Sequence, residues 1–124
     1  MSQVFDKTFG LIMSDADTII DTVNNILNKL DSNIVLKLNE WGKIVQLSID
    51  EKDFFIDFKE NMNLKLKNGS IEHYDFKLIT SSSIFNQIIN NEINPVEAVV
   101  SGEVTIDGSL TDALEFSEIM TSSN

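Results

Sequence analysis

The sequence predicts an α+β domain in which a five-stranded, mainly antiparallel sheet has about five helices packed over one face. Two observations lead to this class: apolar residues recur every three or four positions near both ends of the chain, and they alternate with polar residues in between. A sheet with one apolar face must be covered, and the flanking helices supply that layer. At 124 residues the chain has the usual length of one domain. We therefore expect a single domain over residues 1–124, with residues 1–14 as a loosely packed N-terminal extension.

Two helices are expected before the sheet. Between Asp15 and Leu30, apolar residues recur at three- and four-residue steps among Asp, Asn and Thr, which is typical of an amphipathic helix. The next stretch, SNIVLKLNEW, reads either as a strand or as a second short helix. We favour the helix because its apolar residues fall on one stripe that ends at Trp41, and Gly42 suits a helix end.

The central part of the chain, from Lys43 to Ile79, alternates between apolar and polar residues. Four strands are expected there, over residues 44–50, 54–59, 62–67 and 74–78. Short breaks at Asp50–Lys52, Glu60–Asn61 and Asn68–Gly69 are typical of hairpins or tight loops. The alternation predicts an antiparallel sheet with one apolar face.

Helical spacing returns after these strands. The serines from Ser81 to Ser83 offer caps for a helix over residues 84–89, and Asn94–Pro95 supplies a cap and a first helical position for a short helix that ends at Gly102. Residues 103–107 alternate as a fifth strand. Gly108 and Ser109 then lead into a last helix over residues 110–120, whose apolar residues spread around the cylinder, so it needs cover on more than one side.

The charge balance excludes several classes of partner. The chain has 20 acidic residues against 9 lysines and no arginine, with a formal net charge of −11. Nucleic acid and anionic membrane surfaces would repel such a protein. The absence of cysteine favours a reducing compartment, and the N-terminus has no secretory pattern, so we expect a cytoplasmic protein.

The segment INPVEAVVSGEVTIDGSLTDALEF, residues 93–116, resembles the signature of the sterol carrier protein 2 family. The matching positions are Asn94, Pro95, Ala98, Gly102, Gly108, Ala113 and Leu114. The run DFKLITSSSIFNQIINNEINP before it is similar to the family's strand, serine-rich corner and helix. Residues 16–60 share only the order of helix, short helix and hairpin, so the specific part of the resemblance lies in the last fifty or so residues.

The resemblance implies that the helices and the sheet enclose an apolar cavity that takes up a lipid, and that the protein is a carrier and not an enzyme. The candidate cavity residues are Trp41, Ile56, Phe76, Ile84, Phe85, Ile88, Val99, Val100, Ile106, Leu110 and Leu114. For any one of them, a place in an ordinary core is the commoner explanation of an apolar residue. No cofactor and no metal are expected, since a lone histidine among scattered carboxylates makes a poor zinc site.

Three positions depart from the family pattern in the same direction. Glu92, Glu103 and Glu115 stand where the family often carries lysine. The expected ligand is therefore a neutral or sterol-like lipid, or a fatty acid whose head group sits away from these carboxylates. Strong binding to anionic membranes is not expected.

Two other functions remain open at this stage. One is an interaction module that uses its apolar last helix to dimerise or dock, with no lipid ligand, and both a monomer and a homodimer are compatible with the sequence. An enzyme that uses Asp53, Asp57 and His73 is the other, and no motif supports it. Ser101 lies in V-S-G-E and not in a nucleophile elbow, so a structural role is expected for it.

Overall fold

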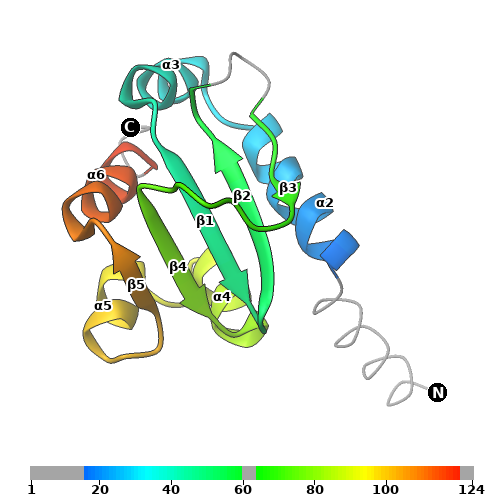
Figure 1. Ribbon diagram of the computed structural model, residues 1–124, viewed down its shortest axis with the longest axis vertical. Coiled ribbons are helices and arrows are strands. Elements are labelled where there is room, and N and C mark those ends of the chain that lie inside the picture. Colours follow the sequence, from blue (N-terminus) through cyan, green and yellow to red (C-terminus); the bar gives the residue numbers. More distant parts are fainter. Residues whose placement is uncertain (1–15, 60–63, 121–124) are drawn as a thin grey trace.

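The computed structural model describes residues 16–59 and 64–120 (Figure 1). Its elements are α2 (Ala16–Asn28), α3 (Ser32–Trp41), β1 (Ile44–Ile49), β2 (Lys52–Asp57), β3 (Lys67–Asn68), β4 (Phe76–Thr80), α4 (Ser82–Ile89), α5 (Pro95–Val100), β5 (Thr105–Gly108) and α6 (Leu110–Met120). The expected N-terminal extension lies outside the described residues. The α+β class, the five strands and the five helices are confirmed.

The two helices before the sheet form where the sequence predicts them. In α2, the buried residues Ile19, Val23 and Leu27 are spaced by four and lie on one face. The Asp31 side chain begins α3 by accepting a hydrogen bond from the Asn33 backbone N–H at 2.8 Å. Gly42 ends α3 with φ at 59°, in the left-handed region that glycine adopts without strain.

Strands β1 and β2 form the predicted antiparallel hairpin, with Ile49 opposite Lys52. The two residues of the turn, Asp50 and Glu51, both have positive φ, as a tight two-residue hairpin turn requires. The same turn is fixed to the start of α4, because the Asp50 carboxylate accepts a hydrogen bond from the Ser82 backbone N–H at 3.1 Å.

The third strand is much shorter than predicted. Leu64 and Leu66 are buried and Lys65 is exposed, so the alternation is real. The backbone, however, pairs with β2 only over two residues of β3. The Leu66 N–H instead donates to the side-chain oxygen of Asn24 in α2, at 2.7 Å, so this segment packs on the helix before it joins the sheet.

The third and fourth strands do not form a hairpin, because they are not neighbours in the sheet. The strand order is β3-β2-β1-β4-β5, so the connection over residues 69–75 passes across β2 and β1 (Figure 1). Strand β4 then pairs with β1 in parallel, and all other pairings are antiparallel, which makes the sheet mixed. The buried Gln46 side chain of β1 accepts a hydrogen bond from the Ile71 N–H and so holds the connection over residues 69–75 against the sheet.

The elements after β4 begin at the predicted caps. The Ser81 hydroxyl accepts a hydrogen bond from the Ile84 N–H, and the Asn94 side chain accepts from the N–H groups of Val96 and Glu97. Ala98, fully buried, accepts backbone hydrogen bonds from residues 103 and 104 and so returns the chain to β5. The loop and helix boundaries here follow the sequence closely.

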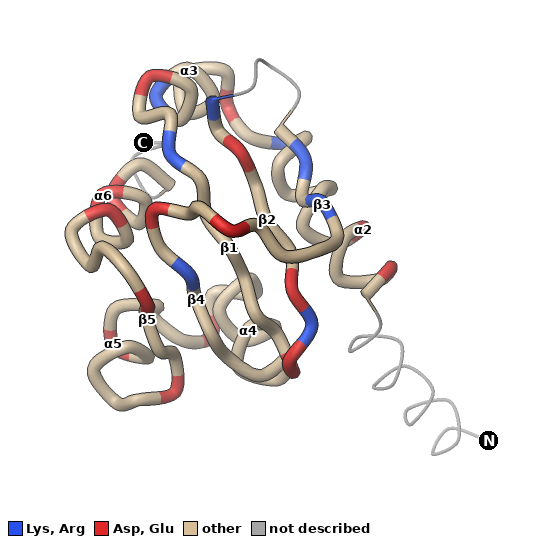
Figure 2. The backbone as a smooth tube through the Cα atoms, viewed as in Figure 1, with Lys and Arg blue, Asp and Glu red and all other residues tan. Residues whose placement is uncertain are grey.

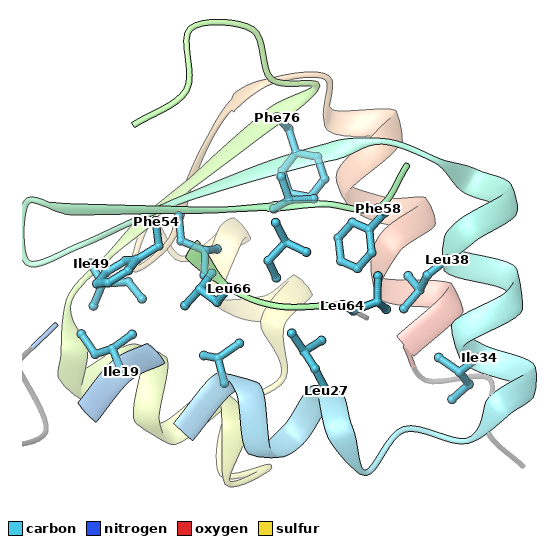
Figure 3. Packing of buried hydrophobic residues seen from close by; sticks show 14 residues of the cluster. Ile19, Leu27, Ile34, Leu38, Ile49, Phe54, Phe58, Leu64, Leu66 and Phe76 are labelled. Carbon is cyan, nitrogen blue, oxygen red and sulfur yellow. The ribbon is translucent and has the colours of Figure 1, made fainter. Parts of the chain in front are cut away.

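The hydrophobic core lies between α2 and the sheet (Figure 3). Ile19 and Leu27 point from α2 toward Ile49, Phe54 and Leu66. The buried cluster comprises Ile19, Val23, Leu27, Ile34, Leu38, Val45, Leu47, Ile49, Phe54, Ile56, Phe58, Leu64, Leu66 and Phe76. Every member precedes α4 in the sequence, so the helices after β4 contribute no residue to the fully buried cluster.

Candidate functional site

The half of the domain that follows β3 differs in packing from the half before it. Helix α4 contains Ile84, Phe85, Ile88 and Ile89, yet none of its residues is fully buried. Helix α6 likewise has no fully buried residue. An apolar helix face that is only half covered by its own chain leaves apolar surface for a ligand or a partner. These helices, together with α5 and the adjoining strands β4 and β5, therefore form the candidate site.

The structure places the eleven candidate cavity residues in three groups. Ile56 and Phe76 are in the buried cluster, and Trp41, Phe85 and Ile106 pack against it. Ile84, Ile88 and Val99 are partly exposed. Val100, Leu110 and Leu114 are 83%, 53% and 44% exposed. The first group is brought together around the core and the last faces solvent; contact with a ligand stays a prediction for all of them.

Four aromatic rings meet where α6 crosses the start of β4 and the end of α3. The Phe116 ring of α6 lies 5.5 Å from Trp41, 5.6 Å from Phe58 and 6.0 Å from Phe76, measured between ring centroids. Trp41 is 5.7 Å from Phe58 in an edge-to-face arrangement. Aromatic pairs at these separations attract one another beyond their burial of area. The cluster therefore holds the last helix against the sheet.

The sequence prediction missed two of these rings. Phe58 continues the alternation of Phe54 and Ile56, which was a usable signal. Phe116 lies three residues after Ala113 and four before Met120, and all three pack against the core. Leu110 and Leu114 occupy another side of α6. The helix thus turns one apolar side inward and a second outward, as the spread of its apolar residues predicted.

Two polar contacts add to the attachment of α6. The Trp41 indole N–H donates to a carboxylate oxygen of Glu115 at 3.1 Å. The Lys43 ammonium, at the start of the sheet, lies 3.4 Å from the carboxylate of Asp112. The sequence predicts that the indole needs an acceptor, but its partner is 74 residues away and only the fold identifies it.

The side chains considered for catalysis lie outside the candidate site. Asp53 and Asp57 share the face of β2 opposite the buried Phe54 and Ile56, and Asp57 accepts a hydrogen bond from the Lys59 N–H. His73 is exposed in the connection before β4. Within residues 16–59 and 64–120, no three His, Cys, Asp or Glu side chains are arranged to hold a metal ion. Ser101 is occupied locally, since its hydroxyl donates to the Ala98 carbonyl and contacts Glu103.

The pKa of Tyr74 is shifted by a contact with Asp107 on the sheet face opposite the core. The Tyr74 hydroxyl donates to the Asp107 carboxylate, and this hydrogen bond, followed by desolvation and the negative charge, raises the pKa of Tyr74 above its usual value. The contact joins the connection over residues 69–75 to β5. We assign the Tyr74–Asp107 contact a structural role.

Among the described helices, none combines the length and the apolar character needed to cross a membrane.

Comparison with known proteins gives a consistent result. The sequence matches the SCP-2 sterol transfer family over residues 23–121. No curated protein sequence matches it significantly. Among solved structures, the apo form of sterol carrier protein 2 from Yarrowia lipolytica has a TM-score of 0.66 at 16% identity, covering 86% of this chain and 89% of that one.

Two further structures are informative for the kinds of protein that have this fold. The sterol carrier protein 2 of Aedes aegypti in complex with the C16 fatty acid palmitate has a TM-score of 0.55 at 17% identity, covering 75% of this chain and 92% of that one. A sec-alkyl sulfatase has a TM-score of 0.64 at 18% identity, covering 82% of this chain but only 16% of the sulfatase. The fold therefore occurs both as a free-standing domain and as a small part of an enzyme.

Proposed function

The chain belongs to the SCP-2 sterol transfer family, and from that premise we propose that it binds and carries an apolar lipid in the cytoplasm without catalysing a reaction. The observation that supports this most directly is the incomplete burial of α4 and α6, whose apolar side chains are half covered by the rest of the domain. A lipid chain placed between these helices and the sheet would complete their burial.

The proposed binding region is the space bounded by α4, α5, α6 and the core face of β4 and β5. Ile84, Phe85, Ile88, Val99 and Ile106 are its partly buried members. We expect Phe76 of β4 in its floor, with Ile56 further along the core face on β2 and Trp41 at the end where α3 meets α6. Val100, Leu110 and Leu114 are its exposed members, and we expect the lipid to contact Leu114 at the rim of α6.

The expected affinity is moderate. Burial of about a dozen methylenes at about 0.8 kcal/mol each stabilises the complex by roughly 10 kcal/mol before costs. Association costs of about 4–15 kcal/mol offset much of this. We expect a dissociation constant of roughly micromolar or weaker. Because the wall is apolar, selectivity among head-group shapes should be low.

Native mass spectrometry of the purified protein, followed by organic extraction, tests the proposal. A discrete adduct of lipid mass on the monomer, or its appearance after incubation with fatty acids, sterols and phospholipids, is the expected result. A mass that stays bare with all three classes would refute lipid carriage.

A matched pair of leucines tests the assignment of the site. Leu114 and Leu36 are 44% and 49% exposed and both lie on helices, but only Leu114 belongs to the proposed region. Leu114→Asp should reduce lipid uptake at least fivefold, whereas Leu36→Asp should leave it unchanged, and both variants should fold because neither side chain is buried. Equal uptake by the two variants removes Leu114 from the site.

A second candidate function is an interaction module with no lipid. The exposure of Val100 and Leu110, at 83% and 53%, favours it, since large apolar side chains on a surface often mark contacts between proteins. The presence of the fold within a longer enzyme is also compatible with it. A stable dimer in analytical ultracentrifugation that Val100→Asp or Leu110→Asp dissociates, together with a bare mass, would support this function over lipid carriage.

A further inference from the structure

The helices around the proposed lipid site carry charge of only one sign. From Leu78 to the end of the chain there is no lysine, arginine or histidine. The same segment contains the acidic residues Glu92, Glu97, Glu103, Asp107, Asp112, Glu115 and Glu118. Figure 2 shows the result in space: α4, α5, β5 and α6 carry no positively charged residue, whereas lysines lie on α3, β2, β3 and β4 and in the segments beside α2, β1 and β2.

One of the lysines that border this region is paired with a carboxylate of α6, and the others lie on the opposite sheet face or in solvent. Lys43 is paired with Asp112 at 3.4 Å. Lys77 lies between Phe76 and Leu78 in β4, so its side chain is on the opposite face of the sheet from theirs, across from Asp107 in β5. Lys37 on α3 is exposed to solvent. A lipid on the core face of β4 and β5 therefore meets no ammonium group from the strands that carry it.

The carboxylate of Glu115 is exposed to solvent at the Trp41 end of the proposed site. It accepts the Trp41 indole N–H at 3.1 Å, and the next residue, Phe116, is in the aromatic cluster. Glu115 thus holds a negative charge beside apolar rings, with a second carboxylate oxygen that can accept a further hydrogen bond. A hydroxyl head group can donate to that oxygen. A fatty-acid carboxylate has no proton to donate and meets a like charge.

We propose that this site selects its lipid by charge: it takes chains with uncharged head groups, such as long-chain alcohols, acylglycerols or sterols, and discriminates against fatty-acid anions. The proposal rests on lipid binding as proposed above and adds the ligand class. Burial of a carboxylate is unfavourable unless a cation or hydrogen-bond donors compensate for it. The nearest cation, Lys43, is already paired with Asp112, and Glu115 adds repulsion.

The test compares two ligands of equal chain length, dodecan-1-ol and laurate, at pH 8, where laurate is ionised because carboxyl groups titrate near pH 4–5. Trp41 is the chain's single tryptophan and lies in the aromatic cluster, so its fluorescence serves as the readout. The expected result is a dissociation constant at least tenfold larger for laurate than for dodecanol. A ratio near one overturns charge selection while lipid carriage stands. Failure of both ligands to bind overturns this proposal, and the mass-spectrometric test with sterols and phospholipids then decides lipid carriage separately.

Variants of Glu115 show whether this carboxylate contributes. In Glu115→Lys the ratio of the two dissociation constants should fall at least fivefold. Glu115→Gln keeps an oxygen that can accept the indole N–H and should give a smaller decrease, which maintains the test if the lysine variant folds poorly. Asp21→Lys makes the same change in net charge on an exposed position of α2, which lies at the opposite edge of the sheet from α6 in Figure 1, and should leave the ratio unchanged. A ratio that responds equally to Asp21→Lys and Glu115→Lys overturns the role of Glu115.

Discussion

The two halves of this domain use apolar residues differently. In α2, the inward residues Ile19, Val23 and Leu27 are all buried against β1 and β2. In α4 and α6, which are comparably apolar, no residue is fully buried. The half before β4 therefore builds the stable core, and the half after it holds apolar side chains at a partly covered surface. The difference indicates where stability resides and where a ligand would bind.

The largest expected effect compares two phenylalanines across this boundary. Phe54 in β2 is fully buried, whereas Phe85 in α4 is partly exposed. Phe54→Ala should lower the free energy of unfolding by about 3–5 kcal/mol, since it leaves a cavity in the core. Phe85→Ala should lower it by about 1–2 kcal/mol, because less area is lost. Urea unfolding measures both, and equal losses would contradict the division into two halves.

A glycine pair tests whether the second half is loosely built throughout. A Cβ on Gly108 would lie 2.7 Å from the Asp75 carbonyl oxygen and 3.1 Å from the Phe76 Cα, and its φ is 99°. Gly108→Ala should therefore cost about 2–4 kcal/mol from strain and crowding together. Gly102 has φ at 85°, and a Cβ built on it would have no neighbouring atom within 4 Å. Gly102→Ala should therefore lower the free energy of unfolding by only about 1–2 kcal/mol. Thermal unfolding with a similar loss for both variants would show that the β5–α6 junction is not tightly fixed.

Ligand binding should act on the second half alone. At a free dodecanol concentration of 100 times the dissociation constant, the folded state gains about 2.7 kcal/mol. Amide hydrogen exchange in α4 and α6 should slow, because the ligand suppresses the local opening of these helices. Exchange in α2 should change only to the extent that it proceeds through global unfolding. Protection of α2 without α4 and α6 would place the lipid elsewhere.

The hydrogen bond between Trp41 and Glu115, which helps to attach α6, should contribute less to the free energy of unfolding than the features above. Trp41→Phe removes the hydrogen bond to Glu115 and should lower stability by about 1 kcal/mol. Amide exchange over residues 110–120 should accelerate, with exchange in α2 affected less. The control is Glu115→Gln, which retains an acceptor for the indole and should keep most of the protection. Unchanged exchange in Trp41→Phe would assign the attachment of α6 to packing only.

The ion pair between Lys43 and Asp112 should contribute least to the free energy of unfolding. Lys43 is 36% exposed and Asp112 14%, at an N–O separation of 3.4 Å. A pair of this exposure stabilises a protein by about 0–1 kcal/mol. Lys43→Met should therefore cost less than Trp41→Phe, and the cost should shrink in about 1 M salt, where charges more than about 3 Å apart are screened. A cost that is larger than for Trp41→Phe and independent of salt would show that the pair is effectively buried.

The helices could be predicted from the sequence alone, because their spacing and caps are local. Ser81 and Asn94 accept hydrogen bonds from residues two or three positions later, and Gly42 ends α3 through its own φ. The hairpin of β1 and β2 is local in the same sense. Of the candidate site, the sequence identified the elements that carry half-buried apolar residues, but not which side of α6 faces the core.

The features that depend on distant partners could not be predicted from local sequence, because they form only when the whole chain packs. Residues 64–66 alternate like a strand, but Asn24 in α2 takes the Leu66 N–H, so the backbone joins the sheet only at β3. The parallel pairing of β4 with β1 depends on the crossing over residues 69–75, which no short-range pattern specifies. Likewise, Trp41 needs an acceptor by its chemistry, but its bond to Glu115 exists because the fold brings α3 and α6 together. Alternation specifies which side chains are buried; the choice of backbone partner is made by the packing of the whole chain.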